Sequence, residues 1–126
     1  METVTYIPNY VTDWTDRYFH QSAFDLPLNH PNKKVLNFLV RTKKPDKVRL
    51  YRGVNRYNKD NRGITSWTHD RQVAERYAKE IGGEVIGKEF QSSKVLLDTT
   101  LLTKKEKRRL GYDYKIDDKE VLILCI

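Results

Sequence analysis

The sequence predicts an α+β fold in which N-terminal helices pack on two small, mostly antiparallel β-sheets. Apolar residues recur at helical spacing in the first third of the chain, and short β-rich segments dominate after residue 46. The chain also ends in an uninterrupted apolar run. Helices that precede a series of strands are typical of α+β domains. With 126 residues, we expect a single domain 1–126, with a helical part at 1–46 and a β-core at 47–126.

Two helices are expected in the N-terminal part. Thr12 or Asp13 can cap the first, which would run to about Ala23. Asn32 can cap the second, and Pro45 ends it because proline cannot continue a helix. The first helix carries three aromatic residues, Trp14, Tyr18 and Phe19. The second carries apolar residues on one face, as a buried stripe requires: Val35, Leu36, Leu39 and Val40.

The β-core is predicted to begin with a strand at residues 48–51, because apolar and β-prone side chains alternate with charged ones there. Arg52 and Gly53 are expected to close this strand. The polar, turn-rich residues 55–62 predict a loop. Residues 64–67 are then predicted to form a second, short strand that leads into a helix.

One helix is predicted inside the β-core. Thr68 or Asp70 can cap it. Gly82-Gly83 stops it, since glycine accepts the left-handed backbone conformation that follows many helices. Five apolar residues form one stripe along this helix: Val73, Ala74, Tyr77, Ala78 and Ile81. The stripe predicts that the helix packs against the sheet.

Two further strands are predicted after this helix, at residues 84–90 and 94–97, with a turn at 91–93. A short basic helix follows them. Thr103 and Glu106 match the capping box S/T-x-x-E, in which each side chain satisfies a backbone donor at the other's position. We expect this helix to end near Gly111, before a loop that leads into the last strand.

The last strand is the apolar run 121–126, whose β-branched residues favour a strand covered on both faces. Two acidic residues, Asp118 and Glu120, lie at its entrance. Residues two apart in an extended chain point to the same side, so both carboxylates would share one face. Taken alone, they could equally be solvated turn residues.

Composition narrows the classes of protein and partner. The net charge of +7 suggests a polyanionic partner or an acidic protein surface. The single cysteine, Cys125, excludes an intramolecular disulfide and fits a cytoplasmic setting. We expect no membrane span, because no apolar run approaches about 20 residues, and no metal site, because His20 and His30 lack ligand spacing. Basic residues cluster at Lys43, Lys44, Lys47 and Arg49, and at Lys104, Lys105, Lys107, Arg108 and Arg109.

Three polar features lie at predicted strand edges. Arg52 would hold a guanidinium on a rigid element, and the following Gly53 would allow close backbone approach, which suits a phosphate. Ser66 and Thr68 alternate to one face of the second strand. Their hydroxyls could cap the next helix or orient a neighbouring carboxylate. Glu120 at the mouth of the last strand is a candidate for that carboxylate.

An Arg, then Ser-x-Thr, then a Glu that starts an apolar strand resembles, in that order, the mono-ADP-ribosyltransferase family with the Arg–Ser–Glu motif set. The matching segments are Leu50-Tyr51-Arg52-Gly53, Thr65-Ser66-Trp67-Thr68 and Asp118-Lys119-Glu120-Val121-Leu122-Ile123. The resemblance covers most of the chain from residue 48 to residue 124. It implies an NAD-binding cleft between the two sheets and makes 47–126 the catalytic part.

The resemblance also implies a reaction. NAD is the substrate: nicotinamide is released, and ADP-ribose passes to a macromolecular acceptor through an oxocarbenium-like transition state. Glu120 would hold the ribose 2′-hydroxyl and stabilise the developing cation. Ser66 would orient Glu120, and Arg52 would anchor the pyrophosphate. The implied NAD contacts are Arg52, Gly53, Ser66, Thr68 and Tyr77, with Arg71 and Arg76 as further candidates; Tyr77 also lies on the apolar stripe, which favours a core position.

The acceptor is the open part of the resemblance. Family members carry Glu or Gln two residues before the catalytic Glu, whereas this chain carries Asp118. An acid at this position favours arginine on a target protein, as it could act as the base that deprotonates the acceptor. Another protein side chain or a nucleic acid remains an alternative. Tyr112 and Tyr114 lie where the family has its acceptor-recognition turn, and either could present its ring to the acceptor or pack in the core.

Two other functions compete with this interpretation. The first is a basic nucleic-acid-binding module without catalysis, and the second is an NAD glycohydrolase toxin that uses water as acceptor. Small enzymes of the resembled kind are similar to bacteriophage or bacterial effectors. We therefore expect a monomer that acts in the cytoplasm on a host or target protein; an acidic target or one bound to nucleic acid would fit the net positive charge.

Overall fold

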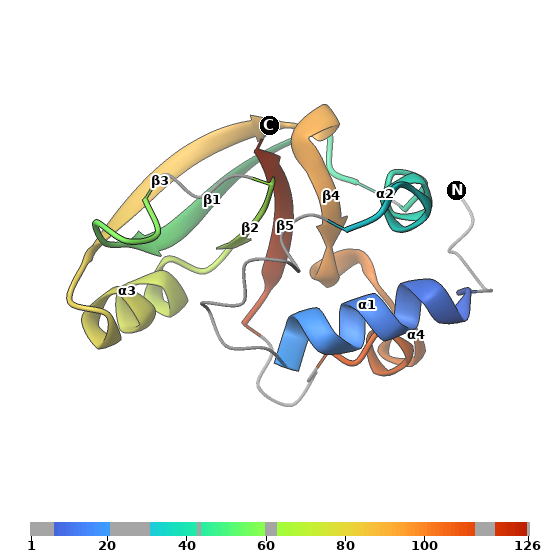
Figure 1. The fold of residues 1–126 in the computed structure, drawn as a ribbon. Coiled ribbons are helices and arrows are strands. Elements are labelled where there is room, and N and C mark those ends of the chain that lie inside the picture. Colours follow the sequence, from blue (N-terminus) through green and yellow to red (C-terminus); the bar gives the residue numbers. More distant parts are fainter. Residues whose placement is uncertain (1–6, 21–30, 43, 60–62, 113–117, 126) are drawn as a thin grey trace.

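The computed structural model describes residues 7–20, 31–42, 44–59, 63–112 and 118–125. Within these residues it shows an α+β fold with four α-helices and one five-stranded antiparallel sheet (Figure 1). The helices are α1 (Asn9–His20), α2 (Lys33–Leu39), α3 (Arg71–Glu80) and α4 (Lys104–Arg109). The strands are β1 (Lys47–Val54), β2 (Gly63–Thr68), β3 (Glu84–Gln91), β4 (Val95–Asp98) and β5 (Glu120–Cys125), with the 3₁₀ turns η2 (Ser92–Lys94) and η3 (Thr99–Leu101).

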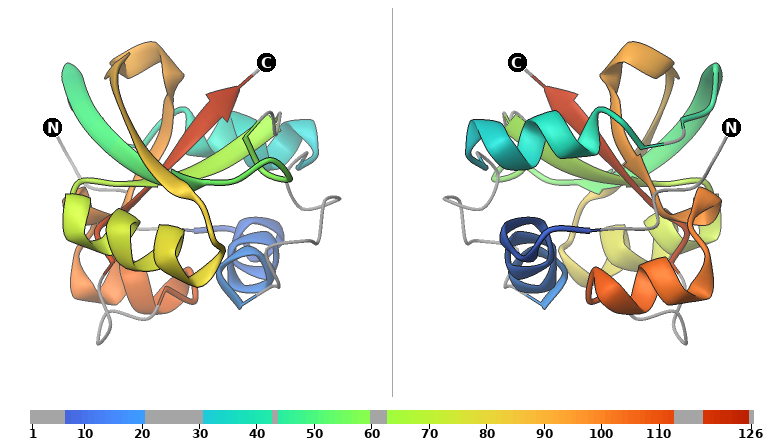
Figure 2. Two further views of the ribbon diagram at one scale, coloured as in Figure 1. Left: turned by 90° about the vertical axis from the view of Figure 1, so that its left-hand side faces the viewer. Right: turned by 90° about the vertical axis from the view of Figure 1, so that its right-hand side faces the viewer.

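The prediction of two sheets is wrong. The strand order β3-β1-β2-β5-β4 is continuous, because β1 and β2 pair at Tyr51 and Thr68. That single pairing position joins the antiparallel pair β3–β1 to the β2–β5–β4 half, and the described residues of β1 and β2 do not pair beyond it. The edge strands β3 and β4 are connected by only the three residues of η2. The sheet must therefore curl until its two edges approach each other (Figure 2).

The curled sheet has a different core on each side. All five strands contribute to an inner cluster formed by Leu50, Trp67, Phe90, Val95, Val121 and Ile123. On the outer face, α1 and α2 cover a second cluster. Its members are Ile7, Val11, Trp14, Tyr18, Val35, Leu39, Ile64, Leu96, Leu97, Leu110 and Leu122. The two clusters explain why β5 is apolar from Val121 onward: its alternate residues face different cores.

Helix α3 lies against β1 at a contact that requires glycine. A β-carbon at Gly53 would lie 2.8 Å from the backbone nitrogen of Ala78 and 3.0 Å from the carbonyl oxygen of Ala74. Because β-carbon contacts this short are not tolerated, the small residues let helix and strand backbones meet directly. Helices α3 and α1 lie on either side of the entrance to β5 (Figure 1).

Several element boundaries differ from the predictions. Helix α1 begins at Asn9, so the prediction that Thr12 or Asp13 caps it is wrong. The carbonyl of Pro8 accepts hydrogen bonds from the amides of Val11 and Thr12 at the start of this helix. The predicted end near residue 23 lies outside the described residues. Strand β1 continues through Arg52 and Gly53, which pair with β3. A 3₁₀ turn, η2, replaces the simple turn expected at 91–93.

The predicted helix caps are largely confirmed. Asn32 caps α2, and Asp70, one of two predicted residues, caps α3 by accepting from the amide of Gln72. The capping box of Thr103 and Glu106 is complete at the start of α4. In the part of the chain that the structure describes, none of the helices has the length and apolar character needed to cross a membrane.

Candidate functional site

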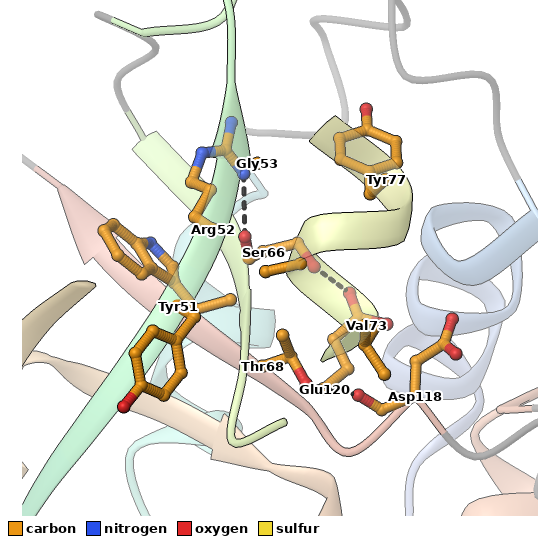
Figure 3. Close-up of a pocket in the computed structure, with 11 residues that line it drawn as sticks. Tyr51, Arg52, Gly53, Ser66, Thr68, Val73, Tyr77, Asp118 and Glu120 are labelled. Carbon is orange, nitrogen blue, oxygen red and sulfur yellow. Dashed lines mark hydrogen bonds between the residues drawn. The ribbon is translucent and has the colours of Figure 1, made fainter. Parts of the chain in front are cut away.

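A pocket with a volume of about 250 Å³ lies where β1 and β2 diverge, between α3 and the entrance to β5. Its lining includes every residue that the sequence singled out for catalysis or NAD contact except the Arg71 and Arg76 candidates (Figure 3). Those residues are Arg52, Gly53, Ser66, Thr68, Tyr77, Asp118 and Glu120. Four further residues complete the lining: Tyr51, Trp67, Val73 and Ala74.

Ser66 and Glu120 meet inside this pocket. Antiparallel pairing sets Thr68 opposite Glu120 and Ser66 opposite Leu122, so these side chains share one face of the sheet. The Ser66 hydroxyl donates a hydrogen bond of 2.6 Å to Oε2 of Glu120. This is the arrangement that the sequence predicted for the pair. A short bond between a hydroxyl and a carboxylate fixes the direction of the acid.

The pKa of Glu120 is raised from the usual 4.5 to about 7. Burial is the main cause, and the negative charge of Asp118 adds to it, whereas the Ser66 hydrogen bond and the Arg52 guanidinium lower the pKa. Glu120 keeps partial solvent exposure through the pocket, but the surrounding protein excludes most water from its carboxylate. Perturbed carboxylates in clefts are characteristic of functional sites.

Arg52 forms one wall of the pocket. Its Nη1 donates a hydrogen bond of 2.7 Å to the backbone carbonyl of Ser66. The bond crosses the gap that opens where β1 and β2 stop pairing beyond Tyr51 and Thr68. The guanidinium therefore links the two strands and lies close enough to lower the pKa of Glu120. The sequence alone predicts only a phosphate anchor at Arg52.

Two of the predicted NAD contacts have structural roles as well. Gly53 lines the pocket, but the close approach of α3 accounts for the absence of a side chain there. The Thr68 hydroxyl donates to the carbonyl of Asp118 over 2.6 Å and accepts from the amide of Asp70 over 3.0 Å. Thr68 thereby joins the start of α3 to the chain that enters β5. Tyr77 is half-buried and lines the pocket, rather than lying fully in the core.

The predicted acceptor residues separate in the structure. Asp118 lies at the pocket rim with its side chain 47% exposed, 3.4 Å from Nη2 of Arg76. Tyr112 is only 7% exposed, so the prediction that it could present its ring to an acceptor is wrong. Its ring packs edge-on against Phe19, and its hydroxyl accepts a hydrogen bond from the amide of Glu120. Tyr114 lies outside the described residues.

Sequence reasoning missed residues that contact or surround Glu120. The Thr99 hydroxyl donates to the Glu120 carbonyl over 2.6 Å. Tyr18 of α1 is buried, and its hydroxyl pKa is raised first by burial and then by the charge of Glu120. No local pattern distinguishes either residue, because each reaches the site through the long-range order of the strands and helices.

Several members of the two basic clusters have local partners. The Lys44 ammonium donates to the carbonyls of Leu39 and Thr42 at the end of α2, and burial lowers its pKa. Lys47 pairs with Glu89 at 3.1 Å. Arg49 and Arg71 lie beside the Tyr51 ring, each 5.8 Å from its centre. Arg109 donates to the carbonyl of Ile7. Lys43 lies outside the described residues.

Searches against models of known protein families, curated proteins and solved structures find no match for this chain. The family assignment therefore stays a resemblance, carried by the motif residues and their arrangement in the pocket. Among the described residues, no group of three or more His, Cys, Asp or Glu side chains is placed to hold a metal ion. The site is defined by one guanidinium, hydroxyls and two carboxylates.

Proposed function

We propose that the protein is an NAD-dependent mono-ADP-ribosyltransferase. The observation that carries this proposal is the 2.6 Å hydrogen bond between Ser66 and Glu120, inside a pocket that Arg52 and Asp118 also line. An acid oriented in this way is what a reaction through an oxocarbenium-like transition state requires. Three separate strands supply the pieces, so their convergence does not follow from chain proximity.

In the proposed reaction, the bond between the ribose anomeric carbon and the nicotinamide nitrogen breaks, and nicotinamide leaves with the bonding electron pair. The acceptor then forms a bond to the same carbon and loses a proton. The Glu120 carboxylate stabilises the positive charge that develops on the ribose. Asp118, exposed at the pocket rim, is suited to receive the proton.

The pocket chemistry suits the nicotinamide–ribose end of NAD. Its volume of about 250 Å³ lies just below the range of roughly 300–1,000 Å³ typical of sites for drug-sized ligands. It therefore suits one end of a dinucleotide better than the whole molecule. The rings of Tyr51 and Tyr77 provide apolar surface for a planar base, while Ser66 and Glu120 provide polar groups for a ribose.

An arginine side chain is the acceptor class that we favour. Asp118 already accepts a guanidinium at the pocket rim, since Nη2 of Arg76 lies 3.4 Å from its Oδ1. Both side chains are largely exposed, so the contact contributes little stability and can be exchanged. A guanidinium from a target protein could take the same position, next to the ribose carbon held by Glu120.

The proposal is tested by incubating the protein with labelled NAD and a cell lysate. Transfer of label to protein is expected, and Glu120→Gln should lower the transfer rate by about 10²–10³-fold. The matched control is Glu75→Gln, which removes an exposed acid of α3 paired with Arg71 and should leave the rate unchanged.

Three outcomes would contradict the proposal. Release of free ADP-ribose without labelled macromolecules would indicate an NAD glycohydrolase. Absence of NAD consumption together with salt-sensitive binding of RNA or DNA would indicate a nucleic-acid-binding module. A Glu120→Gln variant with near-normal transfer would exclude the proposed mechanism, whatever the acceptor.

A further inference from the structure

We propose that Thr99 and Tyr112 are positioning residues that hold the backbone of Glu120 from outside the sheet. The inference rests on the proposed function, because it concerns how the catalytic acid of that reaction is kept in place. Neither residue lines the pocket. Both act on Glu120 through its main chain, Tyr112 at the amide and Thr99 at the carbonyl.

The need for such support follows from where β4 ends. Strand β4 pairs with β5 no further than Asp98 opposite Val121. At Glu120, the next residue outward on β5, no β4 residue is paired with the strand. The Thr99 hydroxyl donates to the Glu120 carbonyl over 2.6 Å, and the Tyr112 hydroxyl accepts from the Glu120 amide over 3.3 Å. Two side chains thus take the place of a partner strand.

The chain that enters β5 is held in a conformation that is unfavourable for its sequence. Lys119 has a φ of +50°, which only glycine adopts readily. Such a residue persists where the surrounding structure imposes it, and these residues cluster at functional sites. The carbonyl of Lys119 accepts from the amide of His69 over 3.2 Å, and that of Asp118 accepts from the Thr68 hydroxyl over 2.6 Å. All three carbonyls from Asp118 to Glu120 therefore accept a hydrogen bond.

Thr99 and Tyr112 are themselves anchored. Asp98, which is 1% exposed, accepts from the amide and the hydroxyl of Thr100 and so shapes the turn that carries Thr99. Oδ2 of Asp98 also lies 2.8 Å from Nε2 of His69, which ties this turn to the start of α3. The Tyr112 ring packs edge-on against Phe19 of α1, with ring centres 5.1 Å apart. Helix α1 therefore supports the site from behind.

Positioning matters here because the protein holds the Glu120 carboxylate away from water. Burial raises its pKa to about 7, so ionisation pulls the side chain toward solvent. The Ser66 hydrogen bond fixes the carboxylate only as well as the backbone beneath it is fixed. A shift of about 1 Å in a catalytic group can lower a rate by about 100-fold. Loss of either backbone contact should therefore lower kcat for NAD cleavage more than it changes KM.

The test uses the full chain with three substitutions. Thr99→Val keeps the shape of the side chain but removes its hydroxyl, and Thr99→Ser restores the hydroxyl. Tyr112→Phe keeps the ring against Phe19. We expect kcat for nicotinamide release to fall by about 10- to 100-fold in Thr99→Val, to fall less in Tyr112→Phe because its contact is longer, and to recover in Thr99→Ser. KM for NAD should change little.

The matched control is Thr42→Val. Thr42 is also buried, and its hydroxyl donates to the carbonyls of Leu39 and Leu96 over 2.7 Å and 3.0 Å, away from the pocket. This variant should lose stability in urea with an unchanged kcat. If Thr99→Val loses stability alone and keeps its kcat, or if Thr99→Ser fails to restore kcat, the positioning role is wrong.

A second measurement separates this proposal from the proposed function. The carboxyl carbon of Glu120 can be followed by NMR as pH is changed, with Arg52, Asp118 and Tyr18, the charged and titratable groups near it, left in place. Thr99→Val should move the midpoint toward the usual value for Glu, because a released carboxylate reaches water. If the wild-type protein does not cleave NAD, the proposed function fails, yet a shifted midpoint still supports the positioning. An unchanged midpoint overturns it.

Discussion

One face of the paired strands β2 and β5 is apolar toward one end and polar toward the other. Toward one end this face carries Ile64 opposite Leu124, and its apolar part continues to Leu122, which lies opposite Ser66. Ile64 and Leu122 are 1% and 0% exposed beneath the N-terminal helices. Toward the other end it carries Ser66, Thr68 and Glu120, which line the pocket. The pairing register between the strands is continuous from one end to the other. The same continuous pair of strands therefore supports both an apolar core and a polar pocket.

The difference shows how a small domain can build a polar pocket on a mostly apolar pair of strands. The apolar end contributes stability, since each buried aliphatic side chain adds roughly 1.5–3 kcal/mol. The polar end reduces stability, because it holds a carboxylate whose pKa is raised to about 7. The continuous pairing of β2 with β5 connects the two ends. If this view is right, substitutions at the two ends should affect different measurable quantities.

The largest effect is expected at the apolar end. Leu122→Ala removes a side chain with 0% exposure from the outer core, and such changes lower the free energy of unfolding by about 2–5 kcal/mol. Urea denaturation followed by far-UV circular dichroism measures the loss. Leu124→Ala is the control, because Leu124 is only partly buried against the same cluster and should cost less. Equal losses in the two variants would mean that the strand does not become more buried toward Leu122.

At the polar end, Glu120→Gln should increase stability while it removes activity. Burial favours the protonated acid in the folded state, so the free energy of unfolding of the wild type falls as pH rises from 4.5 to about 7. The variant has no ionisable group there and escapes this fall. It should gain about 1–3 kcal/mol over the wild type at pH 8 relative to pH 4. Urea denaturation of both proteins at the two pH values measures the gain.

A control for this prediction is Glu75→Gln, whose exposed carboxylate should give no comparable pH-dependent gain. If Glu120→Gln were less stable than the wild type at pH 8, the carboxylate would be a stabilising group. The contrast between the two ends of the face would then be wrong.

Local sequence signals predicted the elements and most of the pocket. Alternation along a strand set Ser66 and Thr68 on one face, and an apolar run that begins with an acid located Glu120 at a strand entrance. Both signals depend on residues near in sequence. The pairing of Thr68 with Glu120 then brings these side chains together, which the order of the motifs only implied.

The remaining features depend on contacts distant in sequence. One pairing position, Tyr51 with Thr68, turns two expected sheets into one, and no local pattern reports a single pairing. Tyr112 was expected in an acceptor loop because tyrosine before a core strand is compatible with either exposure or packing. Its burial follows from helix α1, which approaches from the other end of the chain and places Phe19 against it. Thr99 was not predicted for the same reason, because its contact with Glu120 joins residues that are distant in sequence.

The last of the expected effects concerns the hydroxyl of Ser66, which donates a hydrogen bond to Glu120. Its hydrogen bond lowers the pKa of Glu120, against the larger effect of burial. Ser66→Ala should therefore raise that pKa further above about 7. Because the proposed reaction needs the ionised acid, the acidic limb of the rate profile should move to higher pH. Hydrogen bonds to charged groups contribute roughly 1.5–3 kcal/mol, so the shift should be about 1 pH unit or more.

The measurement is the rate of NAD cleavage between about pH 5 and about pH 9, assay limits that are about two units on either side of the Glu120 midpoint of about 7. Ser66→Ala should lose more activity at the acidic end than at the alkaline end, whereas Ser93→Ala, in the exposed turn η2, should follow the wild type. A uniform loss at every pH would assign Ser66 to orientation alone. A limb that moves to lower pH would contradict the direction in which this hydroxyl acts on the acid. The Ser66→Ala variant thus separates two effects of this hydroxyl on Glu120, the control of its charge and the control of its orientation.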